Sequence, residues 1–194
     1  LAVGPDGRLY LGSSPEGKVY RVGDGGELET YFEPRETYIW ALRFNGAGDL
    51  FVATGDKGRI YRVPAGSEPG SAGELFFESS ETHISTLAWD RENRLLAGTA
   101  SSGYVYRIDG RNEGFLLFNS GGGEIRQIGA GDAGDLFVAT FSAGRQSGPG
   151  AVAEAVASVA TGGESGGAES GSSAGTSGGN GQEAGIVYRV DADG

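Results

Sequence analysis

Short runs of apolar residues alternate with clusters of Gly, Asp, Asn and Ser along most of the chain, and residues 39–78 show the pattern most clearly. There it predicts strands over 39–44, 50–53, 59–63 and 74–78, because β-branched and aromatic runs between turn residues are typical of antiparallel hairpins. Gly58 stands in the hairpin between the second and third of these strands, where a tight turn favours a residue that can adopt a positive φ angle.

The same arrangement continues on both sides of this stretch. Many of the runs lack strict polar alternation, as is expected of strands whose two faces are both covered. The further predicted strands lie at 1–3, 9–12, 19–22, 28–32, 84–89, 95–98, 104–108, 115–119, 125–128, 136–139 and 187–190.

One phrase recurs four times: Gly, any residue, Val or Ile, Tyr, Arg, then Val or Ile. Its tyrosines, at positions 20, 61, 106 and 188, stand 41, 45 and 82 residues apart, so the last interval is two periods long with a single phrase. A period of about 40 to 45 residues made of short strands is typical of a β-propeller with one four-stranded blade per repeat. We therefore predict an all-β propeller fold with about four blades, over approximately 1–37, 38–82, 83–123 and 124–194.

The first and last of these blades are incomplete: the first has only the end of its inner strand, and the last lacks a fourth strand. Because a closed ring needs about four to eight whole blades, we expect an arc of a larger propeller. Residues 146–184 are dominated by Gly, Ser, Ala and Glu and predict a disordered insertion in the last blade. We interpret it as a tolerated surface loop, with a flexible lid or partner-docking arm as the alternative.

Composition excludes several classes of function. The 194 residues contain no Cys and one His, which rules out disulfides, thiolate sites and a metal site built on paired histidines within this chain. A net charge of −11 argues against nucleic acids and anionic membrane surfaces as partners. No apolar run approaches the length of a membrane span. The compartment is undetermined, although the acidic, Cys-free, Gly/Ser-rich character leans towards a periplasmic or secreted location.

The four phrases and their spacing resemble the bacterial propellers related to the regulator-propeller, NHL and WD-repeat families. The resemblance covers the chain outside the insertion. These families include sensor domains, interaction scaffolds and a minority of lactonases and lyases. The Trp-Asp close of WD repeats is replaced here by Tyr-Arg, and no motif matches the metal ligands of gluconolactonase-like propellers. The resemblance therefore implies a fold and no catalytic residue.

Internal repetition separates scaffold residues from candidate ligand residues. The Tyr-Arg pairs recur, so we expect them to serve packing and blade-to-blade hydrogen bonding. Positions that differ between blades are free to contact a ligand, above all at the end of the disc where each inner strand begins, since loops on a rigid scaffold often carry function. The candidate ligand-binding residues at this channel mouth are Tyr38, Trp40, Glu81, His83, Glu124 and Arg126.

Each candidate has a structural alternative. His83 suits acid–base chemistry but could be a hydrogen-bonded surface group, and Trp40 could be a stacking platform or a packed residue. Glu36, Glu81 and Glu124 could form an acidic mouth, although separate solvated carboxylates are the simpler expectation. We assign no catalytic residue, metal or cofactor, because the Asp-rich turns lack the ligand spacing of a calcium loop.

The leading functional hypothesis is a non-catalytic module that binds a protein, a peptide or a saccharide at the mouth. One alternative is a lactonase-like hydrolase or lyase that uses His83 with Glu81 or Glu124. The other is the sensor domain of a larger signalling protein.

Overall fold

The computed structural model describes residues 1–131, 134–142 and 184–191, and all helix or strand elements within these ranges are strands. The predicted strands are present. In the second repeat, the first and last strands begin and end at the predicted residues, 39–44 and 74–78. The strands are β1 (Ala2–Val3), β2 (Leu9–Gly12), β3 (Val19–Val22), β4 (Leu28–Phe32), β5 (Ile39–Phe44), β6 (Leu50–Thr54), β7 (Arg59–Val63), β8 (Glu74–Glu78), β9 (Ile84–Trp89), β10 (Leu95–Thr99), β11 (Tyr104–Gly110), β12 (Glu113–Asn119), β13 (Glu124–Ala130), β14 (Leu136–Ser142) and β15 (Ala184–Val190).

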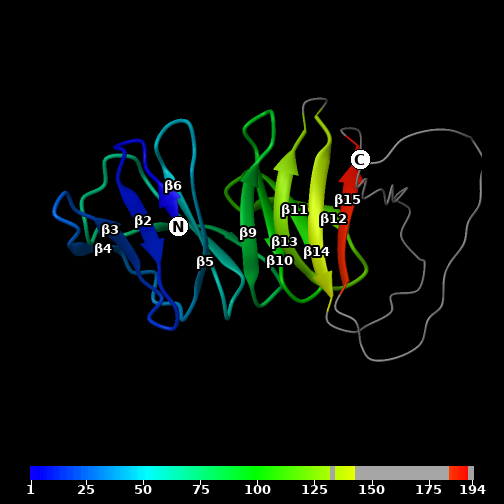
Figure 1. The fold of residues 1–194 in the computed structure, drawn as a ribbon, viewed down its shortest axis with the longest axis horizontal. Helices are drawn as coiled ribbons and strands as arrows, with labels where there is room; N and C mark the ends of the chain where they lie inside the picture. Colours follow the sequence, from blue (N-terminus) through cyan, green and yellow to red (C-terminus); the bar gives the residue numbers. More distant parts are fainter. Residues whose placement is uncertain (132–133, 143–183, 192–194) are drawn as a thin grey trace, which may run out of the picture.

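These strands form four antiparallel sheets in which each strand pairs with its neighbour in sequence. The sheets are β1–β4, β5–β8, β9–β12 and, within the described residues, the three strands β13–β15. They follow one another across the molecule, from the blue sheet to the yellow and red one (Figure 1). Contacts between consecutive sheets join β5 to β1 and β2, β9 to β5 and β6, and β13 to β9 and β10. The sheets are thus consecutive blades of a propeller, numbered 1 to 4 below.

The hydrophobic core consists of three clusters, each held between two consecutive blades. Side chains alternate along a strand, so each blade gives one set of residues to the blade before it and the other set to the blade after it. In β6, Leu50 and Val52 belong to the cluster shared with blade 1, whereas Phe51 and Ala53 belong to the cluster shared with blade 3. Burial on both faces explains why the strands do not alternate between polar and apolar residues.

The repeated Tyr-Arg phrase has a scaffold role within the described residues. Tyr61, Tyr106 and Tyr188 pack against the first, second and third core clusters in turn. The arginines pair with carboxylates of their own blade, not of a neighbouring one, because these carboxylates stand on the same strand, on the adjacent strand or in a turn of the same sheet. The ion pairs are Arg21–Glu29 at 2.8 Å, Arg62–Asp49 at 2.9 Å, Arg107–Asp109 at 3.1 Å and Arg189–Asp135 at 2.8 Å.

Blade 4 has longer strands than the sequence pattern predicts. β13 and β14 extend to Ala130 and Ser142, and β15 begins at Ala184, because backbone pairing continues through 129–130, 140–142 and 184–186, where most residues are Gly, Ala or Ser and give little strand signal. The predicted insertion, 146–184, ends at Ala184, but in the structure Ala184 is the first residue of β15. The rest of the predicted insertion, 146–183, lies outside the described residues.

Candidate ligand site at the inner-strand entrances

A β-bulge occurs at the same place in the inner strands of blades 2, 3 and 4. In β5, Ile39 pairs with Thr54 and Ala41 pairs with Ala53, which leaves Trp40 without a partner in the ladder. The register shifts in β9 and β13 leave Ser85 and Arg126 in the same position. A bulge redirects the side chain of its extra residue. Trp40 and Arg126 were predicted as site residues from their column in the repeat, but the bulges were not predicted.

Three of the predicted site residues meet in one aromatic cluster. The indole Nε1–H of Trp40 donates a hydrogen bond to Nδ1 of His83 at 3.2 Å and so links blade 2 to blade 3. The ring of Tyr38 is stacked on that of Trp40, with centroids 5.3 Å apart and planes inclined by 16°. The His83 ring stands edge-on to both rings. Trp40 is nevertheless 46% exposed, so the cluster offers an aromatic surface to solvent.

Gly55 provides the space for this cluster, and sequence reasoning did not single it out. Its backbone N–H donates to the carbonyl of Tyr38 at 3.0 Å. A Cβ at this position would lie 2.6 Å from both Nδ1 of His83 and Nε1 of Trp40. The corresponding residue in blade 4 is Phe141 of β14, whose ring lies beneath the Arg126 guanidinium at 5.2 Å.

The bulged residues of blades 3 and 4 make other contacts. Ser85 Oγ donates to the carbonyl of Ile125 at 2.6 Å and so joins blade 3 to blade 4. The Arg126 side chain is 57% exposed and forms an ion pair with Glu124 at 3.0 Å. Glu81 accepts a hydrogen bond from Ser102 Oγ at 3.1 Å. Among the described residues, no carboxylate forms a hydrogen bond with His83, so the cluster does not include the two predicted glutamates.

Glu36 is a buried structural residue, and the expectation that it is solvated was wrong. Its side chain is 2% exposed and pairs with Arg59 at 3.2 Å. The hydroxyl of Tyr61 donates to the same carboxylate at 2.8 Å. Burial, followed by this hydrogen bond, raises the pKa of Tyr61 above its ordinary value. The arginine and the tyrosine come from β7, and no local sequence pattern indicates that they converge on Glu36.

The hydrogen bond from Trp40 determines what His83 can offer to a ligand. Because Nδ1 accepts from the indole, the neutral imidazole carries its proton on Nε2 and acts there as a donor. Within the described ranges, no three His, Asp or Glu side chains lie close enough together to hold a metal ion. No helix in the part of the chain that the structure describes could cross a membrane. The site is thus an exposed aromatic surface beside one imidazole donor.

Comparison with known proteins bears on the fold. No protein-family model and no curated protein matches the chain. Virginiamycin B lyase from Staphylococcus aureus matches with a TM-score of 0.61 and 15% sequence identity, over 71% of this chain and 47% of that chain. A provisionally assigned gluconolactonase matches with a TM-score of 0.49 and 18% identity, over 71% and 53% of the two chains. The chain spans about half the length of these structures, and its likeness to the lyase shows a shared β-propeller fold.

Proposed function

We propose that this propeller binds a saccharide at the end of the disc where Tyr38, Trp40 and His83 meet. The observation that carries the proposal is the exposed indole of Trp40, which stands on a bulge and is held by its hydrogen bond to His83. A fixed aromatic ring offers an apolar surface on which a sugar ring can stack at little cost in conformational entropy. The Nε2–H of His83 would donate to a hydroxyl at the edge of that sugar.

Binding is tested by fluorescence of a Trp89→Phe variant, in which Trp40 is the one remaining tryptophan. Cellohexaose, xylohexaose and chitohexaose are titrated separately, and at least one should shift the Trp40 emission in a saturable way. In calorimetry with that saccharide, Trp40→Ala should weaken binding about tenfold or more, a loss of roughly 1.4 kcal/mol. Absence of saturable binding to all three saccharides would overturn the proposal.

A lyase or hydrolase is the second candidate, because the fold is shared with an enzyme, virginiamycin B lyase. In this reaction class His83 would act as an acid through Nε2, with Glu81 or Glu124 as its carboxylate partner. Both carboxylates are engaged elsewhere, by Ser102 and Arg126, so either would have to move towards His83 on substrate binding. The sensor role stays a prediction, as do a peptide or protein ligand and an extracytoplasmic location.

Two substitutions of His83 separate binding from catalysis. His83→Asn keeps an acceptor near the Nδ1 position for Trp40 but removes the titrating ring, whereas His83→Ala removes both. A binding module should lose the Nε2–H hydrogen bond to the sugar in both variants, and it should lose more affinity in His83→Ala because the acceptor that holds Trp40 is removed as well. An enzyme should release product from the saccharide or from a lactone in the wild type, and both variants should abolish that release.

A further inference from the structure

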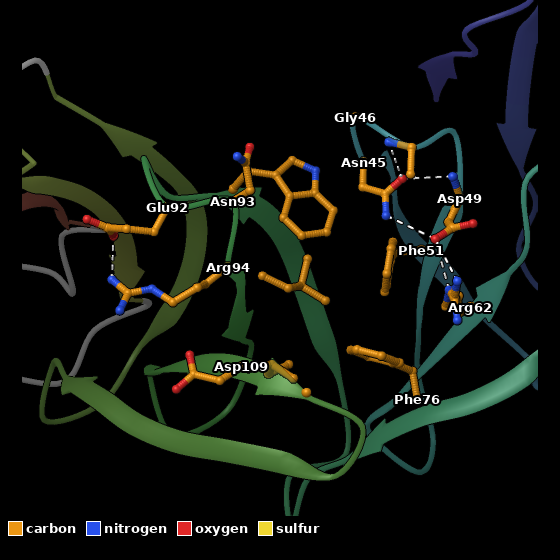
Figure 2. A pocket seen from close by; sticks show the side chains of 15 residues that line it. Asn45, Gly46, Asp49, Phe51, Arg62, Phe76, Glu92, Asn93, Arg94 and Asp109 are labelled. Atoms are coloured by element: carbon orange, nitrogen blue, oxygen red, sulfur yellow. Dashed lines mark hydrogen bonds and ion pairs between the residues drawn. The ribbon is translucent and has the colours of Figure 1, made fainter.

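A cleft of about 640 Å³ opens between blades 2 and 3, at the end of the disc opposite the Trp40 cluster. It lies beyond the last residues of β5 and β9, whereas the Trp40 cluster lies at their first residues. The turn that contains Asn45 and Asp49 forms one wall, and the turn that contains Glu92 and Arg94 forms the other (Figure 2). Its volume falls within the range of about 300 to 1,000 Å³ that is usual for small-molecule sites.

The floor of the cleft is aromatic. Phe51 makes edge-to-face contacts with Phe76 and Trp89, at centroid distances of 5.0 and 5.2 Å. Trp89 Nε1 donates to the carbonyl of Phe44 at 2.8 Å, which fixes the indole between the two blades. Phe51 is 4% exposed, but Phe76 and Trp89 are only half-buried. Ring surface therefore remains open to a ligand.

The same three-ring arrangement occurs between blades 1 and 2, where it is more completely covered. There Tyr10 makes edge-to-face contacts with Tyr31 and Phe44, each with centroids 5.0 Å apart. Tyr31 occupies the position of Phe76 in its blade, yet it is 5% exposed. The connection over 64–73 reaches it, and the N–H of Gly70 donates to the Tyr31 carbonyl at 2.9 Å.

A shorter connection explains why the second arrangement is open. β11 and β12 are joined by Arg111 and Asn112 alone, and the N–H of Asn112 donates to the Phe76 carbonyl at 2.9 Å. Two residues reach the same backbone anchor as the longer connection of blade 2 but bring less chain to lie over the rings. At the third junction the corresponding residues are Leu96, Leu117 and Ala130, so the open aromatic floor distinguishes the cleft between blades 2 and 3.

The walls of the cleft carry more carboxylates than guanidinium groups. Arg94 pairs with Asp90 and Glu92, both at 2.6 Å. Asp109 pairs with Arg107 at 3.1 Å. On the opposite wall Arg62 pairs with Asp49 at 2.9 Å and with Glu74 at 3.9 Å. Among the residues that line the cleft itself, the three carboxylates of Asp49, Glu92 and Asp109 face the two guanidinium groups of Arg62 and Arg94, which leaves an excess of one negative charge beside the rings.

We propose that this cleft is a binding site for a small aromatic cation, a flat ring that carries a protonated amine. The ring would lie against Phe76 and Trp89, and the ammonium group would lie towards Asp109 and Glu92. Attraction between a cation and an aromatic face adds to the attraction by the carboxylates. The net charge of −11 raises the local concentration of cations around the whole chain.

The test uses a Trp40→Phe variant, which leaves Trp89 as the single tryptophan and also removes the indole proposed to bind saccharides. The probes are 2-phenylethylamine and 3-phenylpropionate, which have similar size and opposite charge. The amine should change Trp89 emission in a saturable way and bind about tenfold or more tightly than the acid. Its affinity should fall as salt rises from about 0.01 to 0.15 M, because the carboxylates are screened.

Two matched substitutions locate the site. Gly46 lines the cleft, has open space at its Cβ position and has no positive φ angle, so Gly46→Phe adds a ring at the rim without backbone strain. It should weaken amine binding about tenfold, whereas Gly129→Phe, at a similarly open position on β13, should have no effect. Equal affinity for amine and acid, or unchanged binding in Gly46→Phe, would overturn the proposal. Neither result depends on saccharide binding at the opposite end.

Discussion

Substitution of Gly55 by alanine tests whether the site is held by close packing beneath Trp40 and His83. The added Cβ would lie 2.6 Å from Nε1 of Trp40 and from Nδ1 of His83, about 0.8 Å closer than an ordinary contact. If both nitrogens moved straight away from the new carbon to restore that contact, their separation would grow from 3.2 Å to about 4.2 Å. A separation of that size no longer allows a hydrogen bond.

The expected cost follows from the two effects. Overpacking costs about 1–3 kcal/mol, and loss of the hydrogen bond adds about 0.5–1.5 kcal/mol. A gain of about 0.4–1 kcal/mol from the reduced entropy of the unfolded chain offsets part of this. We therefore expect Gly55→Ala to be destabilised by roughly 0.5–4 kcal/mol and to lose saccharide affinity.

Urea unfolding measures the stability, and the fluorescence of Trp40 in a Trp89→Phe background measures the site. Gly46→Ala is the matched control, because its Cβ meets nothing within 4 Å. It should unfold at the same or a slightly higher urea concentration. If Gly55→Ala unfolded like Gly46→Ala and kept the Trp40 emission of the parent, close packing at Gly55 would not hold the cluster.

Further predictions concern buried charges and tyrosines. Glu36→Gln should lower the free energy of unfolding by about 1–3 kcal/mol, because Arg59 loses a charged partner at a buried position; Glu81→Gln is the control, and equal urea midpoints for the two would contradict the assignment. Burial of Asp49 opposes its ionisation, but hydrogen bonds from the Ala65 N–H, Asn45 and Arg62 outweigh it and hold the pKa of Asp49 below its ordinary value. Because its pKa is lower in the folded state, the Asp49 carboxylate stabilises the folded protein at pH values above its unfolded-state pKa. This stabilisation is lost as the pH falls through the folded-state pKa. Asp49→Asn should therefore reduce the loss of stability seen below about pH 4 in acid-unfolding curves, and an unchanged acid limb would refute this. Burial, followed by the hydrogen bond to Asp6, raises the pKa of Tyr10 to about 12. The protonated Tyr10 hydroxyl should therefore stabilise the folded protein below pH 10, and this stabilisation should be lost towards pH 12. In an absorbance titration, Tyr10→Phe should lack one phenol that ionises late in the wild type. If the variant instead lacked a phenol that ionises near pH 10, the prediction would be refuted.

The repeat unit was readable from the chain because its signals are local. Runs such as 39–44 and 59–63, with turn residues between them, set the strands, and the spacing of Tyr20, Tyr61 and Tyr106 set the blade period. Comparison of equivalent positions also placed Tyr38, Trp40 and His83 at the same end of the disc, where the structure joins them through stacking and a hydrogen bond.

Contacts between blades could not be predicted from local sequence patterns, because they depend on how one sheet packs against the next. The bulge at Trp40 is a register shift between two strands, and the sequence of residues 39–41 does not predict it. The role of Gly55 depends on side chains from two blades that meet above it. From its place in a loop, Glu36 is predicted to be exposed, whereas in the structure Arg59 and Tyr61 of β7 contact its carboxylate.

Periodicity along the chain thus established the strands, the blade period and the end of the disc at which residues differ from blade to blade. Packing in three dimensions established which of those residues touch, that Glu36 is scaffold, and that a two-residue connection in blade 3 leaves an aromatic cleft open. The physical reason is that strand formation depends on neighbours in sequence, whereas burial and hydrogen bonding at a site depend on residues about one blade apart, such as Trp40 and His83.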